Sequence, residues 1–297
     1  MSSTSNEACG YASAAYLRAL GQVPLPLGAT GGHLTVRPFG TQTDLAGPYP
    51  IFTCQNWSAL AEAVETLPPG PVTLTLVADP FNPLGGAGLS KIFPLCCKLH
   101  DHWVIDLSAL PSLSRHHAQK LRRAKPLRIE AGPADPTFGP AWAGLYANLI
   151  ERKDIRDARA FSSESLSAQL SVPGAHLVTG WDGETLLGAD LYYLDGARAF
   201  AHLSAYAPEG YARSVSYPML AAAVDYLKPR VSVIDLGGAP AGAAGQGIAA
   251  FKAGWTPQTR PSFLCGKVLD PAAYASLARD AVATAYFPAY RAGEFKS

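Results

Sequence analysis

Three apolar runs in the second half of the chain alternate with polar residues, and two Asp-Gly pairs separate them. The segments follow one another as 176–181, Asp182-Gly183, 185–194, Asp195-Gly196 and 199–206. Asp-Gly between alternating runs is a strong β-hairpin signal, because a tight hairpin turn needs residues that tolerate a positive φ. The pattern therefore predicts a three-stranded antiparallel meander.

Helical periodicity and turn residues place further elements on both sides of this meander. Before it, the pattern predicts an amphipathic helix over 141–152 and a second helix capped by Ser162 or Ser163. After it, the expected elements are a loop over 208–216, a helix over 217–227, a strand over 231–236, a short helix at Phe251, a strand over 263–269 and a helix from its N-cap Asp270 to about residue 285. This half is thus expected to be an α/β unit.

The first half of the chain has a looser pattern of the same kind. The expected elements are helices over 7–20 and 57–67, the second capped by Asn56, strands over 33–39, 72–78 and 103–107, and Gly/Pro-rich loops over 45–52 and 79–88. A basic segment follows, in which Ser108 or Ser112 caps a helix that runs to Ala124 and stops at Pro126. The chain is therefore expected to hold two α/β units joined by this helix.

Composition narrows the class of protein. Of the 297 residues, 48% are hydrophobic and 16% are charged, which is typical of globular domains. The net charge of +1 gives no overall field that would recruit nucleic acid or an anionic membrane. The 5 cysteines form a poor disulfide framework, and neither a membrane-spanning run nor a signal peptide is recognisable. These features favour a cytoplasmic protein, and no Cys/His spacing indicates a metal site.

The segment 231–255 carries the clearest candidate chemistry. A short apolar strand ends at Asp235, and Gly237-Gly238, a Gly/Ala-rich loop and Phe251-Lys252 follow it. A glycine-rich loop lets the backbone approach a ligand closely. Lys252 is therefore either a functional cation or a surface lysine after an ordinary strand–loop–helix connection.

This segment resembles the "DLGG…FKxGF/W" pattern of the FemAB-like acyltransferases, a group of the GNAT superfamily that includes BioF2-like acetyltransferases. The basic run Arg115–Lys125 and the later helix with Phe161-Ser162 resemble family segments in the same order, so the resemblance covers about residues 106–290. It implies tandem GNAT-like domains with mixed, mostly antiparallel sheets and a cleft between them. The implied parts are a diverged N-terminal domain over 1–107, a basic linking helix over 108–126 and a C-terminal acyltransferase domain over 127–297.

The resemblance also singles out the loop after the meander. In GNAT enzymes this loop cradles a pyrophosphate on free backbone N–H groups at a helix N-terminus. The candidate donor or phosphate contacts in this chain are then Gly210, Ala212, Arg213 and Ser214. Ala207 stands where the family has Gln or Arg, and Glu209 adds a negative charge. Those two departures argue against ordinary coenzyme A binding, and a plain loop before a helix remains the alternative.

Lys252 is the first catalytic candidate. The resemblance places it at the donor site, together with Phe251, Gly237 and Gly238. Acyl transfer to an amine builds an oxyanion, and a fixed cation near that oxyanion lowers the barrier. In this family the substrate itself can take the proton of the amine, so catalysis does not require a protein base.

His202 and Asp190 are the other catalytic candidates. Strict alternation puts His202 on one face of the third meander strand with Phe200, Ser204 and Tyr206. Histidine has a pKa suited to a general base, although a lone strand histidine is more often structural. Asp190 lies within the middle strand, where a buried carboxylate is either functional or part of a local polar network.

Basic residues gather in the helix that joins the two halves. They are Arg115, Lys120, Arg122 and Arg123, with Lys125 after them. Such a run is commonly a solvated surface, and the alternative is contact with the phosphates of an acceptor or of RNA.

These features predict an N-acyltransferase or aminoacyltransferase. Its donor is expected to be aminoacyl-tRNA or acyl-CoA, used as a cosubstrate and not held permanently, with a slight preference for aminoacyl-tRNA. The acceptor is expected to be an amine of a small molecule or of a peptidoglycan (cell-wall) precursor. The alternative is a non-catalytic GNAT-like ligand-binding protein, which the altered phosphate loop and the lack of an obvious base favour.

Overall fold

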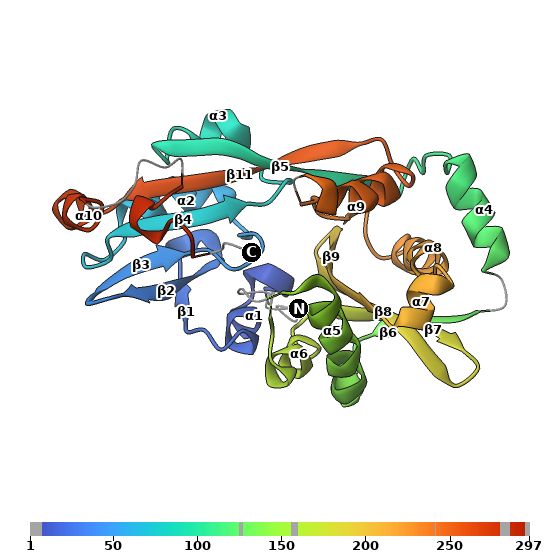
Figure 1. The fold of residues 1–297 in the computed structure, drawn as a ribbon. Coiled ribbons are helices and arrows are strands. Elements are labelled where there is room, and N and C mark those ends of the chain that lie inside the picture. The colour runs from blue at the N-terminus through green and yellow to red at the C-terminus, as the bar shows by residue number, and fades with distance from the viewer. Residues whose placement is uncertain (1–7, 125–126, 156–159, 241, 280–285, 295–297) are drawn as a thin grey trace, which may run out of the picture. The chain divides into compact units, whose positions relative to one another are not determined.

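The computed structural model describes residues 8–124, 127–155, 160–240, 242–279 and 286–294 (Figure 1). The chain divides into two units. The first holds the residues up to His100 and from Pro261 onward, and the second holds Asp101–Arg260. The boundaries fall inside two strands, β5 (Leu95–Asp106) and β11 (Thr259–Val268). Among the residues described, no helix combines the length and the apolar character that crossing a bilayer requires.

The first unit is built on a sheet of mixed direction. Its strands lie in the order β1–β2–β3–β4–β11, with β3 and β4 parallel and the other neighbours antiparallel. Its elements besides β11 are β1 (Pro24–Pro26), β2 (His33–Phe39), β3 (Gln42–Ala46), β4 (Thr73–Ala78), α1 (Ala14–Ala19), α2 (Leu60–Glu65), α3 (Gly85–Leu89) and α10 (Pro271–Leu277). Leu45, Leu74 and Leu60 belong to one buried core in which α2 packs on the sheet.

The second unit is built on a mostly antiparallel sheet. Its strands lie in the order β5–β10–β9–β8–β7–β6, and only the β9–β10 pair is parallel among the described strands of this unit. Its elements besides β5 are β6 (Arg128–Pro133), β7 (Ala175–Asp182), β8 (Thr185–Asp195), β9 (Arg198–Tyr206), β10 (Val233–Asp235), α4 (Arg115–Arg123), α5 (Gly139–Lys153), α6 (Ser163–Gln169), α7 (Pro208–Ala212), α8 (Ser216–Leu227) and α9 (Ala243–Ala253).

Helices cover both faces of this second sheet. Tyr192 of β8 lies in the core that surrounds α8, whereas the next residue, Tyr193, donates a hydrogen bond from its hydroxyl to the Gln169 carbonyl in α6, at 3.1 Å. Successive strand residues point to opposite faces of a sheet. Helix α8 therefore covers one face and α6 covers the other, and the candidate site lies on the α8 face.

The meander predicted from the Asp-Gly pairs is confirmed as β7, β8 and β9. Gly183 and Gly196 each adopt a φ of 57°, the left-handed conformation that their turns require. Ser162 and Asp270 cap α6 and α10 as expected, since each side chain accepts a hydrogen bond from a backbone N–H of the first turn. The predicted mixed, mostly antiparallel α/β class is thus confirmed.

The units have different boundaries from the predicted domains. The segment from Pro261 onward was expected in the C-terminal domain, but it lies in the first unit because Phe263–Val268 of β11 pair with Thr73–Ala78 of β4. The helix expected to link the halves is α4 of the second unit, and it begins after Ser114 rather than after Ser108 or Ser112. Ser108 instead donates its hydroxyl to the Asp106 carboxylate, at 2.6 Å.

Several local predictions need correction. The loop expected over 208–216 contains α7 and the start of α8, and the loop over 79–88 contains the start of α3. Asn56 makes no capping bond to the helix that follows it. The edge strand β6 was not predicted, because its sequence is short and polar. The last helix, α10, ends at Leu277 and not near residue 285 as predicted. Lys125 and Pro126 of the basic segment lie outside the described residues.

Candidate functional site

A small cavity of about 60 Å³ lies on the α8 face of the second sheet. The residues that line it come from β8, β9, α8, α9 and the end of β10; they are Asp190, Tyr192, Ala201, Ser204, Tyr206, Ser216, Leu220, Leu236, Phe251 and Lys252. The cavity exists because β10 pairs with β9 only along Arg198–Phe200 and then ends, so the rest of β9 has lost its neighbour on that side. Two of the predicted catalytic residues, Asp190 and Lys252, therefore meet in one space.

Lys252 lies in the last turn of α9 with most of its side chain buried. Its ammonium donates a hydrogen bond to the Gly238 carbonyl at 2.5 Å, so the glycine pair after β10 holds the cation in place. Burial lowers the pKa of Lys252 to about 8, and the charge of Asp235 partly offsets this effect. The lysine is thus a positioned cation that remains mostly protonated at neutral pH.

Asp235 was part of the sequence motif but received no role in the sequence prediction. Its carboxylate is 3% exposed, accepts a hydrogen bond from the Gly237 N–H at 2.7 Å and lies 2.9 Å from Nδ1 of His102. His102, on β5, is also buried. The rule that a buried carboxylate needs partners could have flagged Asp235, whereas nothing local in the sequence pointed to His102. This pair fixes the turn that carries Gly237 and Gly238.

Asp190 is buried and lines the same cavity. Tyr206 donates its hydroxyl to Oδ1 of Asp190 at 2.7 Å, and Ser204 also hydrogen-bonds to this carboxylate. Burial nevertheless raises the pKa of Asp190 to about 6. A carboxylate with that pKa accepts a proton readily near neutral pH, so Asp190 has the chemistry of a general base.

The structure separates His202 from these residues. A β-bulge shifts the register, so that Tyr192 pairs with Ala201 while Leu191 pairs with Leu203. The prediction that His202 shares a face with Ser204 and Tyr206 is therefore wrong, because the bulge inserts a residue and breaks strict alternation.

His202 instead faces α6. Its Nε2 donates to the side-chain oxygen of Gln169 at 2.7 Å, and its ring stacks on Tyr193 with centroids 4.7 Å apart. Burial lowers the pKa of His202 to about 3, so the ring is neutral and does not gain a proton near pH 7. These contacts fit a structural role on the face away from the cavity.

The segment expected to cradle a phosphate is folded on itself. The backbone N–H groups of Tyr211, Arg213, Ser214 and Val215 donate to carbonyls of 207–211, at 2.9–3.1 Å. Arg213 pairs with Asp182 at the surface. Ser214, which has a φ of 56°, accepts a hydrogen bond from Lys120 of α4 at 3.0 Å. Ala212 is exposed at the end of α7. The four N–H groups are occupied, so they offer no cradle in this conformation.

Gly210 has a packing reason for being glycine. A Cβ built at this position would lie 2.1 Å from the Leu187 carbonyl oxygen of β8. We expect Gly210→Ala to lower the free energy of unfolding by about 1–3 kcal/mol, because helix α7 must move off the sheet. Gly144→Ala is the matched control, because that helical glycine of α5 has nothing within 4 Å of the added Cβ. The control is expected to raise stability by about 0.5–1 kcal/mol. Urea denaturation measures both, and a neutral Gly210→Ala would contradict the packing argument.

The basic residues of α4 divide into two groups. Arg115, Arg122 and Arg123 are exposed, whereas Lys120 is partly buried against Ser214. The inner face of α4 carries His117, whose Nε2 donates to the Phe251 carbonyl at 2.8 Å. The helix is thus fixed to α9 on one side and presents arginines on the other.

The two sequence segments that carry the family resemblance are in contact. His117 of the basic helix packs against the rings of Phe251 and Trp255, with centroids 5.7 and 5.6 Å apart. A Cβ at Gly254 would lie 1.9 Å from the His117 ring. The Phe-Lys-Ala-Gly-Trp sequence therefore needs its glycine to admit the imidazole, and its phenylalanine lines the cavity beside Lys252.

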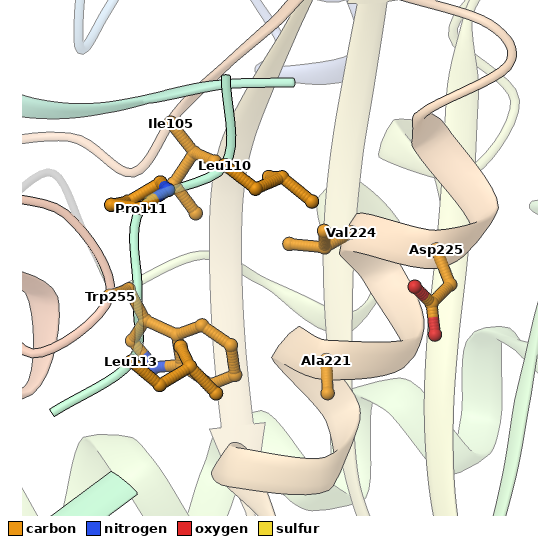
Figure 2. A pocket seen from close by; sticks show the side chains of 8 residues that line it. All are labelled: Ile105, Leu110, Pro111, Leu113, Ala221, Val224, Asp225 and Trp255. Atoms are coloured by element: carbon orange, nitrogen blue, oxygen red, sulfur yellow. The ribbon is translucent and has the colours of Figure 1, made fainter. Parts of the chain in front are cut away.

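A second cavity, of about 170 Å³, lies on another side of α8. Figure 2 shows Leu110 and Trp255 on one side of it and Val224 and Ala221 of α8 on the other. Its lining is apolar apart from the exposed carboxylate of Asp225. A cavity of this composition can hold an apolar group but has few groups for acid–base chemistry, in contrast to the cavity of Asp190 and Lys252.

Comparison with known proteins supports the fold. No family model matches the chain, and no curated protein matches its sequence. Among solved structures, the chain is similar to FemX (TM-score 0.63, 12% identity, 89% of this chain and 92% of that one). It is also similar to L-PGS from Bacillus licheniformis (TM-score 0.61, 13% identity, 86% and 87%). The C-terminal domain (DUF2156) of a protein assigned as a lysylphosphatidylglycerol synthetase from Agrobacterium fabrum matches at a TM-score of 0.59 (14% identity, 90% and 90%).

These likenesses define the class of fold. At such identities they show a shared architecture along most of each chain. The resemblance to the FemAB-like, GNAT-type acyltransferases that the sequence indicated is therefore confirmed for the fold.

Proposed function

We propose that the protein transfers an acyl or aminoacyl group from an activated donor to an amine. The observation that carries this proposal is the meeting of a positioned cation, Lys252, and a carboxylate of raised pKa, Asp190, in one small cavity. The fold shared with FemX and with a lysylphosphatidylglycerol synthetase supports the same class of reaction.

The chemistry divides between these two side chains. The amine nitrogen forms a bond to the acyl carbon, and the carbonyl oxygen becomes an oxyanion that the Lys252 ammonium stabilises. Asp190 takes the proton that the nitrogen loses, with the Tyr206 hydroxyl hydrogen-bonded to it. The bond to the donor's oxygen or sulfur then breaks, and the leaving group carries away the electron pair and gains a proton.

The assay that tests this reaction uses the purified full chain. It is incubated with aminoacyl-tRNA or acyl-CoA and a panel of primary amines, among them a peptidoglycan precursor, and the products are identified by mass. A product heavier than the amine by the acyl group supports the proposal. Lack of product with every donor and amine of the panel would count against it.

Aminoacyl-tRNA is the donor that we favour. The occupied N–H groups of Tyr211, Arg213, Ser214 and Val215 weaken the case for a coenzyme A pyrophosphate site. The exposed arginines of α4 can contact RNA phosphates. If Arg115, Arg122 and Arg123 contact phosphates, tRNA affinity should fall with salt by about 0.7–0.9 log units per contact per decade.

Replacing these three arginines with alanine should flatten that salt dependence. Filter binding across a range of salt concentrations measures the slope. The matched control removes three exposed basic residues elsewhere, Arg18, Lys91 and Lys228, and should leave the slope unchanged. Saturable micromolar binding of coenzyme A with no tRNA binding at low salt would instead favour an acyl-CoA donor.

The alternative is a ligand-binding protein without transfer activity. It is favoured by the same occupied N–H groups, because these four groups then cannot bind the pyrophosphate of a donor. Lys252→Ala separates the two functions. An enzyme loses turnover while it stays folded, whereas a binding protein has no turnover to lose.

A further inference from the structure

A groove of about 530 Å³ lies beside the cavity, and Tyr206 lines both. Its lining comes from α5, the end of β9 and α7; the residues are Asn148, Glu151, Arg152, Tyr206, Pro208 and Tyr211. This volume is within the range of small-molecule sites and suits a ligand the size of an amino acid or a dipeptide.

The outer part of the groove holds a positioned guanidinium. Arg152 lies over the ring of Tyr211, with 3.6 Å between its Cζ and the ring centroid. Tyr211 in turn packs edge-on against Tyr206, with centroids 5.3 Å apart. A guanidinium held over an aromatic ring keeps its N–H groups at its edge, where they can bind a carboxylate with two parallel hydrogen bonds.

Tyr206 connects the groove with a buried carboxylate. The Tyr206 hydroxyl is hydrogen-bonded to Asp190, so an amine beside Tyr206 lies next to the group that takes its proton. Glu151 adds a second carboxylate to the lining. The groove thus presents positive charge at Arg152 and negative charge at Glu151. Asp190 lines the neighbouring cavity and is linked to the groove through its hydrogen bond with Tyr206.

We propose that this groove is the acceptor subsite and that its ligand is a zwitterion of the α-amino acid class, with the carboxylate on Arg152 and the amine toward Tyr206 and Asp190. The role of the groove as an acceptor site rests on the proposed function, whereas its binding of the zwitterion does not.

Ligand-observed NMR with the full chain tests the binding. The probes are L-alanine, L-serine and L-lysine, each compared with its methyl ester, which lacks the carboxylate, and with its Nα-acetyl derivative, which lacks the α-ammonium group. At least one free amino acid should bind about 10-fold or more tightly than both derivatives, because charge-assisted hydrogen bonds are the strong ones.

Variants of α5 test whether Arg152 binds the carboxylate of the ligand. Arg152→Gln should reduce binding of the free amino acid to the level of its methyl ester and leave the ester unaffected. Arg152→Lys should retain part of the binding, because lysine keeps the positive charge but lacks the planar guanidinium that forms two parallel hydrogen bonds. Lys153→Gln is the matched control, since it removes a neighbouring exposed cation that does not line the groove, and it should change nothing.

Three results would overturn the proposal: no binding of any of the three amino acids, equal binding of an amino acid and its ester, or binding that Arg152→Gln leaves intact. Failure of the proposed function gives a different pattern. If the zwitterion binds in a manner that depends on Arg152 but no transfer product forms, the binding site stands and the proposed function is wrong. If transfer occurs and does not depend on Arg152, the proposed function stands and the groove is not its acceptor site.

Discussion

Replacing Lys252 with alanine, or with the nearly isosteric methionine, is expected to lower kcat for amine acylation by about 10²–10³-fold, the usual cost of losing one oxyanion-stabilising group. The ammonium is fixed on the Gly238 carbonyl and lines the same cavity as Asp190, so its loss removes positive charge where the proposed reaction would form its oxyanion. Burial lowers the pKa of Lys252 to about 8. The wild-type rate should therefore decline as the pH rises through about 8 and the cation loses its proton.

Steady-state kinetics over a pH series, with thermal unfolding of each variant, measures this effect. Lys228→Ala is the control, because it removes an exposed lysine after α8. It should keep both the rate and the alkaline decline. A folded Lys252→Met variant with wild-type kcat would show that the cation does not stabilise the transition state.

Replacing Asp190 with asparagine is expected to lower kcat/KM by about 10²–10⁴-fold, the range of general acid–base catalysis. Asparagine retains an oxygen that accepts the Tyr206 hydroxyl, so the polar contact survives while the proton acceptor is lost. Burial raises the pKa of Asp190 to about 6, and a base works in its deprotonated form. The wild-type rate should therefore rise with pH up to about 6.

The pH profile distinguishes catalysis from structure. With both groups intact the profile should be bell-shaped, with its maximum between about 6 and 8. Asp190→Asn should remove the decline of the rate at acid pH and keep its decline at alkaline pH. Asp225→Asn, an exposed carboxylate of α8, should leave both sides unchanged. An acid side that persists in Asp190→Asn would assign the base to another group, including the substrate.

The candidate site depends on contacts that sequence patterns describe poorly. Lys252 and Asp190 were each plausible from local context, but their meeting follows from the end of β10 and the packing of α8 and α9. His202 was also a candidate, and a single bulge turned it to the other face. Tyr206 gained its importance only through its bond to Asp190.

Local signals in the sequence determined the meander, most helices and the mixed α/β class. Asp-Gly turns, alternation and capping residues such as Ser162 and Asp270 act within a few residues, so they can be read without the rest of the chain. Only the tertiary structure decided that β11 pairs with β4 and that His117 packs on Gly254. These contacts join residues far apart in sequence, and their energy comes from packing that no local pattern encodes.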